Sequence, residues 1–230
     1  MQRVEDFAKI EFKLNVGWNE IKDCIVKRLG EMFQDYPDYF FTEQDVHSLL
    51  CDIANEELQL YGITSTETND RHEVSLVHHK YPTPFRCDMN DYRFEKKDKP
   101  PYERGHYDLV ILNPTFVRKN SLDLVCANNL EESETSRTYA NSTPLLWVCE
   151  VAFFPKIRAI SNTAFLQIRQ DSLKVKETLK HRVGAKSERY CMTGSVLVFS
   201  RHNTREAADL RKQVEKLEET LELEIILTTA

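Results

Sequence analysis

The 230-residue sequence contains only six glycines, and they do not form the closely spaced group that a phosphate-binding loop requires. P-loop and dinucleotide-binding proteins need such glycines because the backbone must approach the phosphate groups closely. The sequence also lacks the glycine-flanked serine that marks the nucleophile of α/β-hydrolases. Nucleotide binding of those types and serine hydrolysis are therefore not expected.

Long apolar runs are also missing, since no stretch approaches the roughly 20 apolar residues that span a bilayer. The first six residues, Met1 to Asp6, lack the apolar core of a signal peptide. The six cysteines are widely separated and include no Cys-x-x-Cys pair, so neither a disulfide scaffold nor a zinc ribbon is expected. These absences predict a soluble, cytoplasmic protein with reduced thiols and no membrane contact.

Positive charge is in deficit, with 31 lysines and arginines against 37 acids and a formal net charge of −6. This balance argues against a general nucleic-acid coat, whose attraction to phosphates depends on positive charge. One segment, 174–189, is nevertheless basic, and it is either a phosphate-binding surface or a solvated helix face. Its basic residues are Lys174, Lys176, Lys180, Arg182, Lys186 and Arg189.

Hydrophobic spacing predicts a single α/β domain in which helices separate several of the strands. Helices are expected at 19–34, from near Thr42 to about residue 61, at 162–182 and at 204–220. Strands are expected at 74–84, 106–112, 145–154, 194–200 and 223–227. This order favours a mixed sheet of about five strands flanked by helices. Residues 1–41 are expected to be an N-terminal helical extension, and residues 42–230 the α/β core.

Two charged segments do not fit the pattern of helices and strands. Residues 86–104 are rich in lysine and proline, and residues 114–143 include an acidic run with little apolar content. Both are predicted to be loops, the second a long insertion in the core. Loops of this length are uncommon in compact domains unless they are functional or disordered.

Two acids lie inside the predicted apolar strands, Asp108 in the second strand and Glu150 in the third. Burying a lone carboxylate is costly, so each must be protonated, paired with a cation or bound to a metal. If the two strands are neighbours, the carboxylates can meet where the strands separate and can hold Mg²⁺ or Mn²⁺. Such a metal would support hydrolysis of phosphodiester bonds.

A second interpretation of the same two acids is structural. Asp108 would form an internal salt bridge with Arg104 or His106, and Glu150 would pair with a lysine of the following helix. Residue types alone leave both interpretations open.

The residues around the two acids resemble the PD-(D/E)XK, or restriction-endonuclease-like, nuclease superfamily. Residues 105–111 resemble the strand that carries the aspartate motif, and Trp147–Ala152 resembles the next strand with its acid. Residues 171–175 resemble a D-x-x-K-L turn of the following helix, and 194–201 the strand after it. The resemblance covers about residues 42–227 and implies a restriction-endonuclease-like fold with an extra N-terminal helix.

The resemblance also implies a function, that of a hydrolase which cuts DNA with Mg²⁺ or Mn²⁺. Asp108 and Glu150 would be metal ligands, and Glu43 or Asp45 of the first core helix would complete the metal site. Many nucleases of this kind work as dimers, so a homodimer with contacts through the 114–143 insertion is one expectation. The phosphate contacts would come from Lys176, Lys180, Arg182, Lys186 and Arg189.

The sequence departs from the superfamily pattern at Ala152. The motif has a lysine two residues after the glutamate, where it orients and activates the attacking water, and a methyl group can do neither. Lys156 or Lys174 could supply the missing ammonium group as a catalytic residue. The alternative is a catalytically inactive nuclease-fold protein that binds nucleic acid or another protein.

Overall fold

A computed structural model describes most of the chain, and five segments as well as the first residue lie outside this description. Some side chains near the ends of the described segments are also outside it. The described residues are 2–87, 103–126, 145–155, 162–182, 192–201 and 204–230.

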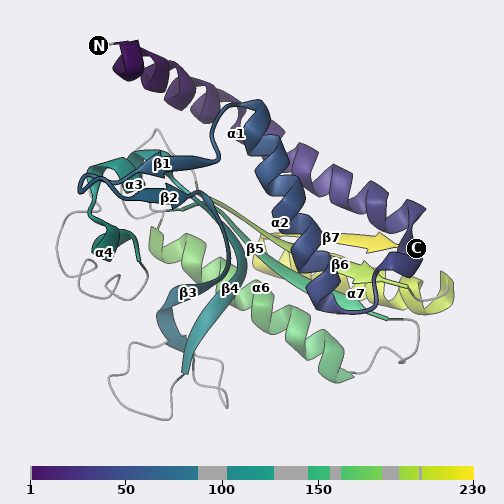
Figure 1. The fold of residues 1–230 in the computed structure, drawn as a ribbon. Helices are drawn as coiled ribbons and strands as arrows, with labels where there is room; N and C mark the ends of the chain where they lie inside the picture. The colour runs from purple at the N-terminus through teal and green to yellow at the C-terminus, as the bar shows by residue number, and fades with distance from the viewer. Residues whose placement is uncertain (1, 88–102, 127–144, 156–161, 183–191, 202–203) are drawn as a thin grey trace.

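A five-stranded mixed sheet forms the centre of the protein, with the strand order β3-β4-β5-β6-β7 (Figure 1). Strand β4 pairs antiparallel with both β3 and β5. Strand β6 pairs parallel with both β5 and β7. The prediction of a mixed α/β protein with a five-stranded sheet is thereby confirmed. The strands are β3 Val77–Cys87, β4 Glu103–Leu112, β5 Leu145–Phe154, β6 Thr193–Ser200 and β7 Glu224–Thr229.

Four helices pack around this sheet (Figure 1). Helix α1 packs on α2 and β7, and α2 contacts β3, β4 and β5. Helix α6 contacts β5 and β6, and α7 contacts β7 and α6. The two helix pairs place the middle strands in the interior, and every residue of β5 is buried. The helices are α1 Gln2–Asp35, α2 Glu43–Leu60, α6 Asn162–Arg182 and α7 Thr204–Leu221.

Local signals explain where α2 begins and ends. The hydroxyl oxygen of Thr42 accepts the backbone N–H of Asp45, and the Asp45 carboxylate accepts the backbone N–H of Thr42, which completes a capping box. The helix stops before Gly62, whose φ of 73° lies in the left-handed region that glycine adopts without steric cost. The helix was predicted from near Thr42 to about residue 61, and both ends are confirmed.

The second half of α1 packs against the core, and residues 1–41 were predicted to be an N-terminal helical extension. Lys22 Nζ lies 2.9 Å from the Glu224 carboxylate of β7, and the indole N–H of Trp18 donates to Thr193 Oγ1 at 3.2 Å. These bonds attach α1 to the parallel half of the sheet. The buried face of the helix is Trp18, Ile21, Ile25, Leu29 and Phe33.

Several short elements were not predicted. Strands β1 Ser65–Glu67 and β2 Glu73–Ser75 form a separate two-stranded sheet, and a 3-10 helix, η1, spans Pro37–Tyr39. None of the described helices is both long enough and apolar enough to cross a membrane. The cysteines that the structure describes, among them the buried Cys149, are free thiols.

The prediction of a loop at 114–143 was wrong for its first part. Residues Pro114–Lys119 form helix α3 and Leu122–Val125 form α4, and the side chains of Phe116 and Val125 are buried. Asn113 caps α3 by accepting the backbone N–H of Thr115, and proline suits the first helical position. Residues 127–144 and most of the predicted loop 86–104 lie outside the described residues.

Candidate metal and catalytic centre

The candidate centre consists of the acids Glu43, Asp108, Glu150 and Asp171 with His47, Lys80 and Lys174, and it lies where β4 and β5 separate. The pairing of the two strands extends to Leu109 and Cys149 and stops there, immediately before Asp108 and Glu150. In place of a further backbone pair, Asp108 Oδ2 accepts the backbone N–H of Val151 at 2.9 Å. The Asp108 carboxylate therefore lies between the two strands, where the ladder opens.

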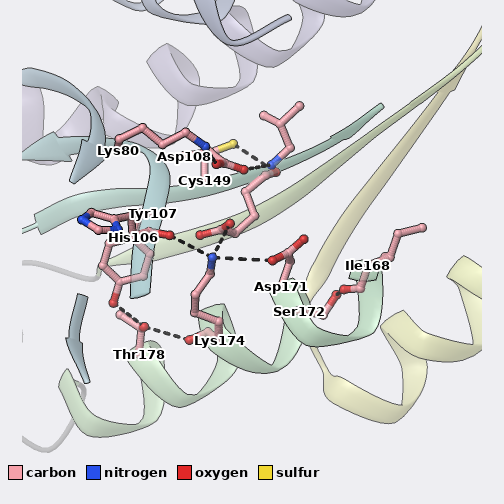
Figure 2. Close-up of polar contacts among 12 residues, drawn as sticks. Lys80, His106, Tyr107, Asp108, Cys149, Ile168, Asp171, Ser172, Lys174 and Thr178 are labelled. Carbon is pink, nitrogen blue, oxygen red and sulfur yellow. Dashed lines mark hydrogen bonds and ion pairs between the residues drawn. The ribbon is translucent and has the colours of Figure 1, made fainter. Parts of the chain in front are cut away.

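A lysine of β3 occupies the other oxygen of this carboxylate. Lys80 Nζ lies 2.6 Å from Asp108 Oδ1 (Figure 2). Lys80 has a φ of 52°, a left-handed conformation that costs about 1 kcal/mol in a residue other than glycine. Strained conformations of this kind persist where the surroundings hold the residue, and the ion pair with Asp108 is such a constraint.

Helix α2 places two further side chains, His47 and Glu43, near this carboxylate. His47 Nε2 lies 3.5 Å from Asp108 Oδ2 and 3.9 Å from Glu43 Oε1. Glu43 and His47 are four residues apart, so they lie on the same face of the helix one turn from each other. One ligand atom from each of the three side chains lies within 4.8 Å of the other two, a spacing at which they could hold a metal ion.

His47 is buried without a hydrogen bond. Its side chain is only 4% exposed, and neither ring nitrogen makes a hydrogen bond with any group in the described part of the chain. A buried polar group without a partner typically costs 1–3 kcal/mol, at about the level of a lost hydrogen bond. The position of this imidazole therefore needs an explanation that packing alone does not supply.

Glu150 faces the opposite helix and is the most deeply buried acid of the centre, with 1% of its side chain exposed. Its Oε2 lies 2.6 Å from Lys174 Nζ of α6, whereas its Oε1 has no hydrogen-bond partner among the described residues. Lys174 also donates to the backbone carbonyl of His106 at 2.9 Å and lies 3.5 Å from Asp171 Oδ1 (Figure 2). Three oxygen groups thus fix the ammonium group.

The environment of Asp108 favours its charged form. Burial alone would raise the pKa of this carboxyl group. The interactions with His47 and Lys80 and the N–H of Val151 outweigh burial, so the pKa lies well below its usual value. Asp108 is therefore an anion across the neutral pH range.

The opposite holds for the acids beside Lys174. Burial raises the pKa of Glu150 well above its usual value in spite of Lys174, and the charges of Asp171 and Asp108 raise it further. Burial likewise raises the pKa of Asp171 to about 6. Burial lowers the pKa of Lys174, but the two acids outweigh it and the pKa lies above its usual value. Lys174 therefore stays charged, whereas Glu150 and Asp171 take up protons more readily than ordinary carboxylates.

Glu43 completes the centre with a raised pKa, because of its burial and then because of the charge of Asp108. Among the described residues, the centre contains four carboxyl groups, from Glu43, Asp108, Glu150 and Asp171, and two ammonium groups, from Lys80 and Lys174. A divalent cation would balance this surplus of acids.

The two central acids lie on neighbouring strands, which was the condition for a shared metal site, but each also has a lysine of its own. Glu150 pairs with a lysine of the following helix, as the structural interpretation predicts. Asp108 pairs with Lys80 and not with His106, and the side chain of Arg104 lies outside the described residues. Both interpretations of the acids therefore keep support.

The other predicted site residues are placed as follows. Asp45 serves the capping box and is bound to the backbone of Phe41 and Thr42, so its carboxylate is used at the helix start. Ala152 is buried in β5, and Lys156 lies outside the described residues.

Little of the predicted phosphate-binding surface can be compared with the structure. Lys176 lies on α6 and is half-buried, and Lys180 and Arg182 lie at the end of the same helix, with side chains outside the description. Lys186 and Arg189 lie outside the described residues. The phosphate contacts stay a prediction.

His47 and Lys80 were not predicted as site residues from the sequence. The only signal for His47 was its spacing of four residues from Glu43 on a helix, which is common and not specific. Lys80 could be placed only with knowledge of the β3–β4 register.

Comparisons with protein-family models, with curated proteins and with solved structures gave no match. No family is shown, and fold class alone does not imply a function. The function must therefore be inferred from the chemistry of this centre.

Proposed function

We propose that the protein is a divalent-metal-dependent nuclease of the PD-(D/E)XK type that hydrolyses phosphodiester bonds in DNA. One observation carries the proposal. Asp108 and Glu150 lie on adjacent strands at the point where pairing stops, and a partly buried lysine from the next helix contacts Glu150. The order α2, β3, β4, β5, α6, β6, with an antiparallel and then a parallel half of the sheet, supports a restriction-endonuclease-like fold.

The residues fit a divalent cation. Asp108 is held in its charged form and lies with Glu43 and His47 at a spacing that could hold a metal ion, whereas Glu150 lies outside this group. Carboxylate oxygens suit Mg²⁺ and Mn²⁺. When bound, such a cation would polarise the phosphodiester and stabilise the negative charge of the leaving oxygen.

Lys174 would replace the lysine that the motif has at the position of Ala152. Its ammonium group is fixed by Glu150, Asp171 and the carbonyl of His106, so little orientation is left to be lost during the reaction. Because its pKa is raised, Lys174 would act as a hydrogen-bond donor that orients the attacking water and neutralises developing negative charge. It would not act as the base.

Glu150 is suited to accept the proton of that water. Burial raises the pKa of Glu150 well above its usual value, which increases the affinity of this carboxylate for a proton. Each residue would then have one role. Asp108 stays charged and would hold the metal ion, Lys174 stays charged and would orient the attacking water, and Glu150 would accept the proton of that water.

A second candidate function is that of a nuclease-fold protein that binds nucleic acid without cutting it. The ion pair of Lys80 with Asp108 favours it, since an ammonium group already neutralises the acid that should hold the metal. The methyl group of Ala152 in the motif position favours it as well.

A nuclease assay with a parallel binding measurement separates the two candidates. Supercoiled plasmid, linear duplex and single-stranded DNA would be incubated with the purified protein and Mg²⁺ or Mn²⁺, with and without chelator. The proposal predicts cleavage that the chelator abolishes. Fluorescence anisotropy that shows DNA binding without any cleavage would support the second candidate, and the absence of both binding and cleavage would contradict both.

A further inference from the structure

We infer that His47 is a metal ligand, and that Glu43, His47 and Asp108 form a site that prefers transition-metal dications such as Mn²⁺ and Co²⁺ over Mg²⁺ and Ca²⁺. The inference deepens the proposed function and rests on it, because it names the cation with which the same centre works. It is carried by the position and the burial of the imidazole.

The spacing of the three side chains fits one small cation. Ligands that each lie about 2.1 Å from an ion are separated by about 3.0 Å at octahedral and about 3.4 Å at tetrahedral angles. The separations from His47 Nε2 are 3.5 Å to Asp108 Oδ2 and 3.9 Å to Glu43 Oε1. The three ligand atoms all lie within 4.8 Å of one another, so the flexible side chain of Glu43 would have to move closer to bring all three to coordination distance.

The Asp108 oxygen near His47 keeps capacity for an ion. Oδ1 is taken by Lys80, whereas Oδ2 accepts one hydrogen bond, from the backbone N–H of Val151. A carboxylate oxygen has two acceptor positions, so Oδ2 can bind a cation on the side that faces His47. The ion pair with Lys80 therefore does not block the site.

Apart from its approach to the Asp108 and Glu43 carboxylates, the imidazole has no polar contact that explains its position in the described structure. It is buried, it is aimed between two carboxylates, and neither nitrogen makes a hydrogen bond with the described residues. A cation at Nε2 would satisfy the nitrogen that now lies unbonded between the two acids. Glu43 and His47 come from successive turns of a helix with a complete capping box, so the two ligands are held on a rigid element.

The nitrogen donor determines the preference. Mg²⁺ and Ca²⁺ are hard cations that take oxygen ligands, whereas imidazole suits transition metals, whose affinity rises from Mn²⁺ through Co²⁺ to Ni²⁺. A site of two carboxylates alone would serve Mg²⁺ well. The same site with His47 gains more for Co²⁺ and Mn²⁺ than for Mg²⁺.

Spectroscopy on the untagged 230-residue chain tests this directly, independently of activity. Titration with Co²⁺ followed by visible absorption gives the affinity, and pulsed electron paramagnetic resonance with Mn²⁺ detects a coordinated ¹⁴N nucleus. We expect Co²⁺ to bind at least about 100-fold more tightly than Mg²⁺, and His47→Gln to weaken Co²⁺ binding at least about tenfold while Mg²⁺ binding changes less than about threefold. A matched control is His72→Gln, because His72 also lies near an acid, Asp70, at 3.8 Å, but on the surface.

Two results would overturn the inference: a wild-type protein that binds Mn²⁺ without a ¹⁴N signal, and a His47→Gln variant that keeps the full preference for Co²⁺. The wild-type measurement decides even if the variant does not fold. Failure of the proposed function is a separate result. If the protein binds Mn²⁺ through His47 but does not cleave DNA, the metal site is supported and the nuclease function is contradicted. If cleavage depends on Mg²⁺ and is unchanged in His47→Gln, the nuclease function is supported and the role of His47 as a metal ligand is contradicted.

Discussion

Lys174 Nζ lies 2.6 Å from Glu150 Oε2 and 2.9 Å from the backbone carbonyl oxygen of His106, so one ammonium group of α6 joins β4 to β5 at the point where the two strands separate. Breaking a buried ion pair on one side leaves a charge without compensation and typically costs 3–5 kcal/mol. Glu150 can lower this cost by taking up a proton, since its pKa is already raised.

Lys174→Met is therefore expected to lower the free energy of unfolding by about 3 kcal/mol and to abolish any cleavage. Urea unfolding measures the first effect, and the DNA assay the second. Adding Glu150→Gln to Lys174→Met should recover part of the stability and none of the activity. Lys176→Met, on the same helix, is the control and should change the stability by less than about 1 kcal/mol. Equal losses in the two variants would contradict a special role for Lys174.

The pKa of Asp171 predicts how stability depends on pH. This pKa is raised from its ordinary value to about 6 in the folded protein, so between pH 4 and pH 6 the folded state binds more protons than the unfolded state. The contribution of Asp171 to stability is then present below pH 4 and is lost as the pH rises through 6.

Asp171→Asn should remove this loss. The free energy of unfolding of the variant, relative to the wild type, should rise by about 1–3 kcal/mol between pH 4 and pH 7. Urea unfolding at a series of pH values measures it. Asp209→Asn removes one charge at an exposed position of α7 and is the matched control. A difference that stays constant over this pH range would contradict the raised pKa.

Gly194 sets the distance between β6 and α6. A Cβ atom at this position would lie 2.4 Å from Val175 Cγ1, far inside contact distance, and 3.3 Å from Leu179 Cδ1. Gly194→Ala would push α6, and Lys174 with it, away from the sheet. We expect a loss of about 1–3 kcal/mol in stability.

The second variant for this contact is Val175→Ala, which removes the methyl group in the way. In its background, Gly194→Ala should cost less than about 1 kcal/mol, so the two effects should not add. Thermal and urea unfolding of the four proteins completes the cycle. Additive losses would mean that the glycine serves another purpose.

The packing of α1 gives a test of the domain organisation. Leu29 is fully buried on the face of α1 that contacts the rest of the protein, whereas Leu60, at the end of α2, is 78% exposed. Leu29→Ala should cost about 2–5 kcal/mol, and Leu60→Ala should change stability by less than about 0.5 kcal/mol. A small loss at Leu29 would contradict an energetic contribution of α1 to the core.

The sequence predicted the main elements well because their signals are local. The run 145–154 is apolar almost throughout, and the predicted strand coincides with β5 Leu145–Phe154. The helical spacing of 162–182 coincides with α6 Asn162–Arg182. In both segments the order of apolar and polar residues along the chain is enough to predict which side chains are buried. Short elements such as β1, β2 and α4 lack such a pattern, since three or four residues carry no period.

The site was predicted in part. Asp108 and Glu150 stood out because an acid inside an apolar strand is unusual, and the structure places them where two neighbouring strands part. Lys80 and His47 could not be recognised, because their role depends on the β3–β4 register and on the rotation of α2 against the sheet. Tertiary packing, which no short window of sequence contains, brings these groups to Asp108.

The most direct test of the proposed nuclease compares the cleavage of one DNA substrate by Asp108→Asn, Glu150→Gln and Asp209→Asn, purified side by side with the wild type. Each variant replaces an acid by its neutral amide of nearly the same shape, and only the first two change the centre. We predict cleavage by the wild type and by Asp209→Asn, and a loss of at least about 100-fold in each of the other two. Cleavage that survives in both Asp108→Asn and Glu150→Gln would contradict a catalytic centre at these two acids.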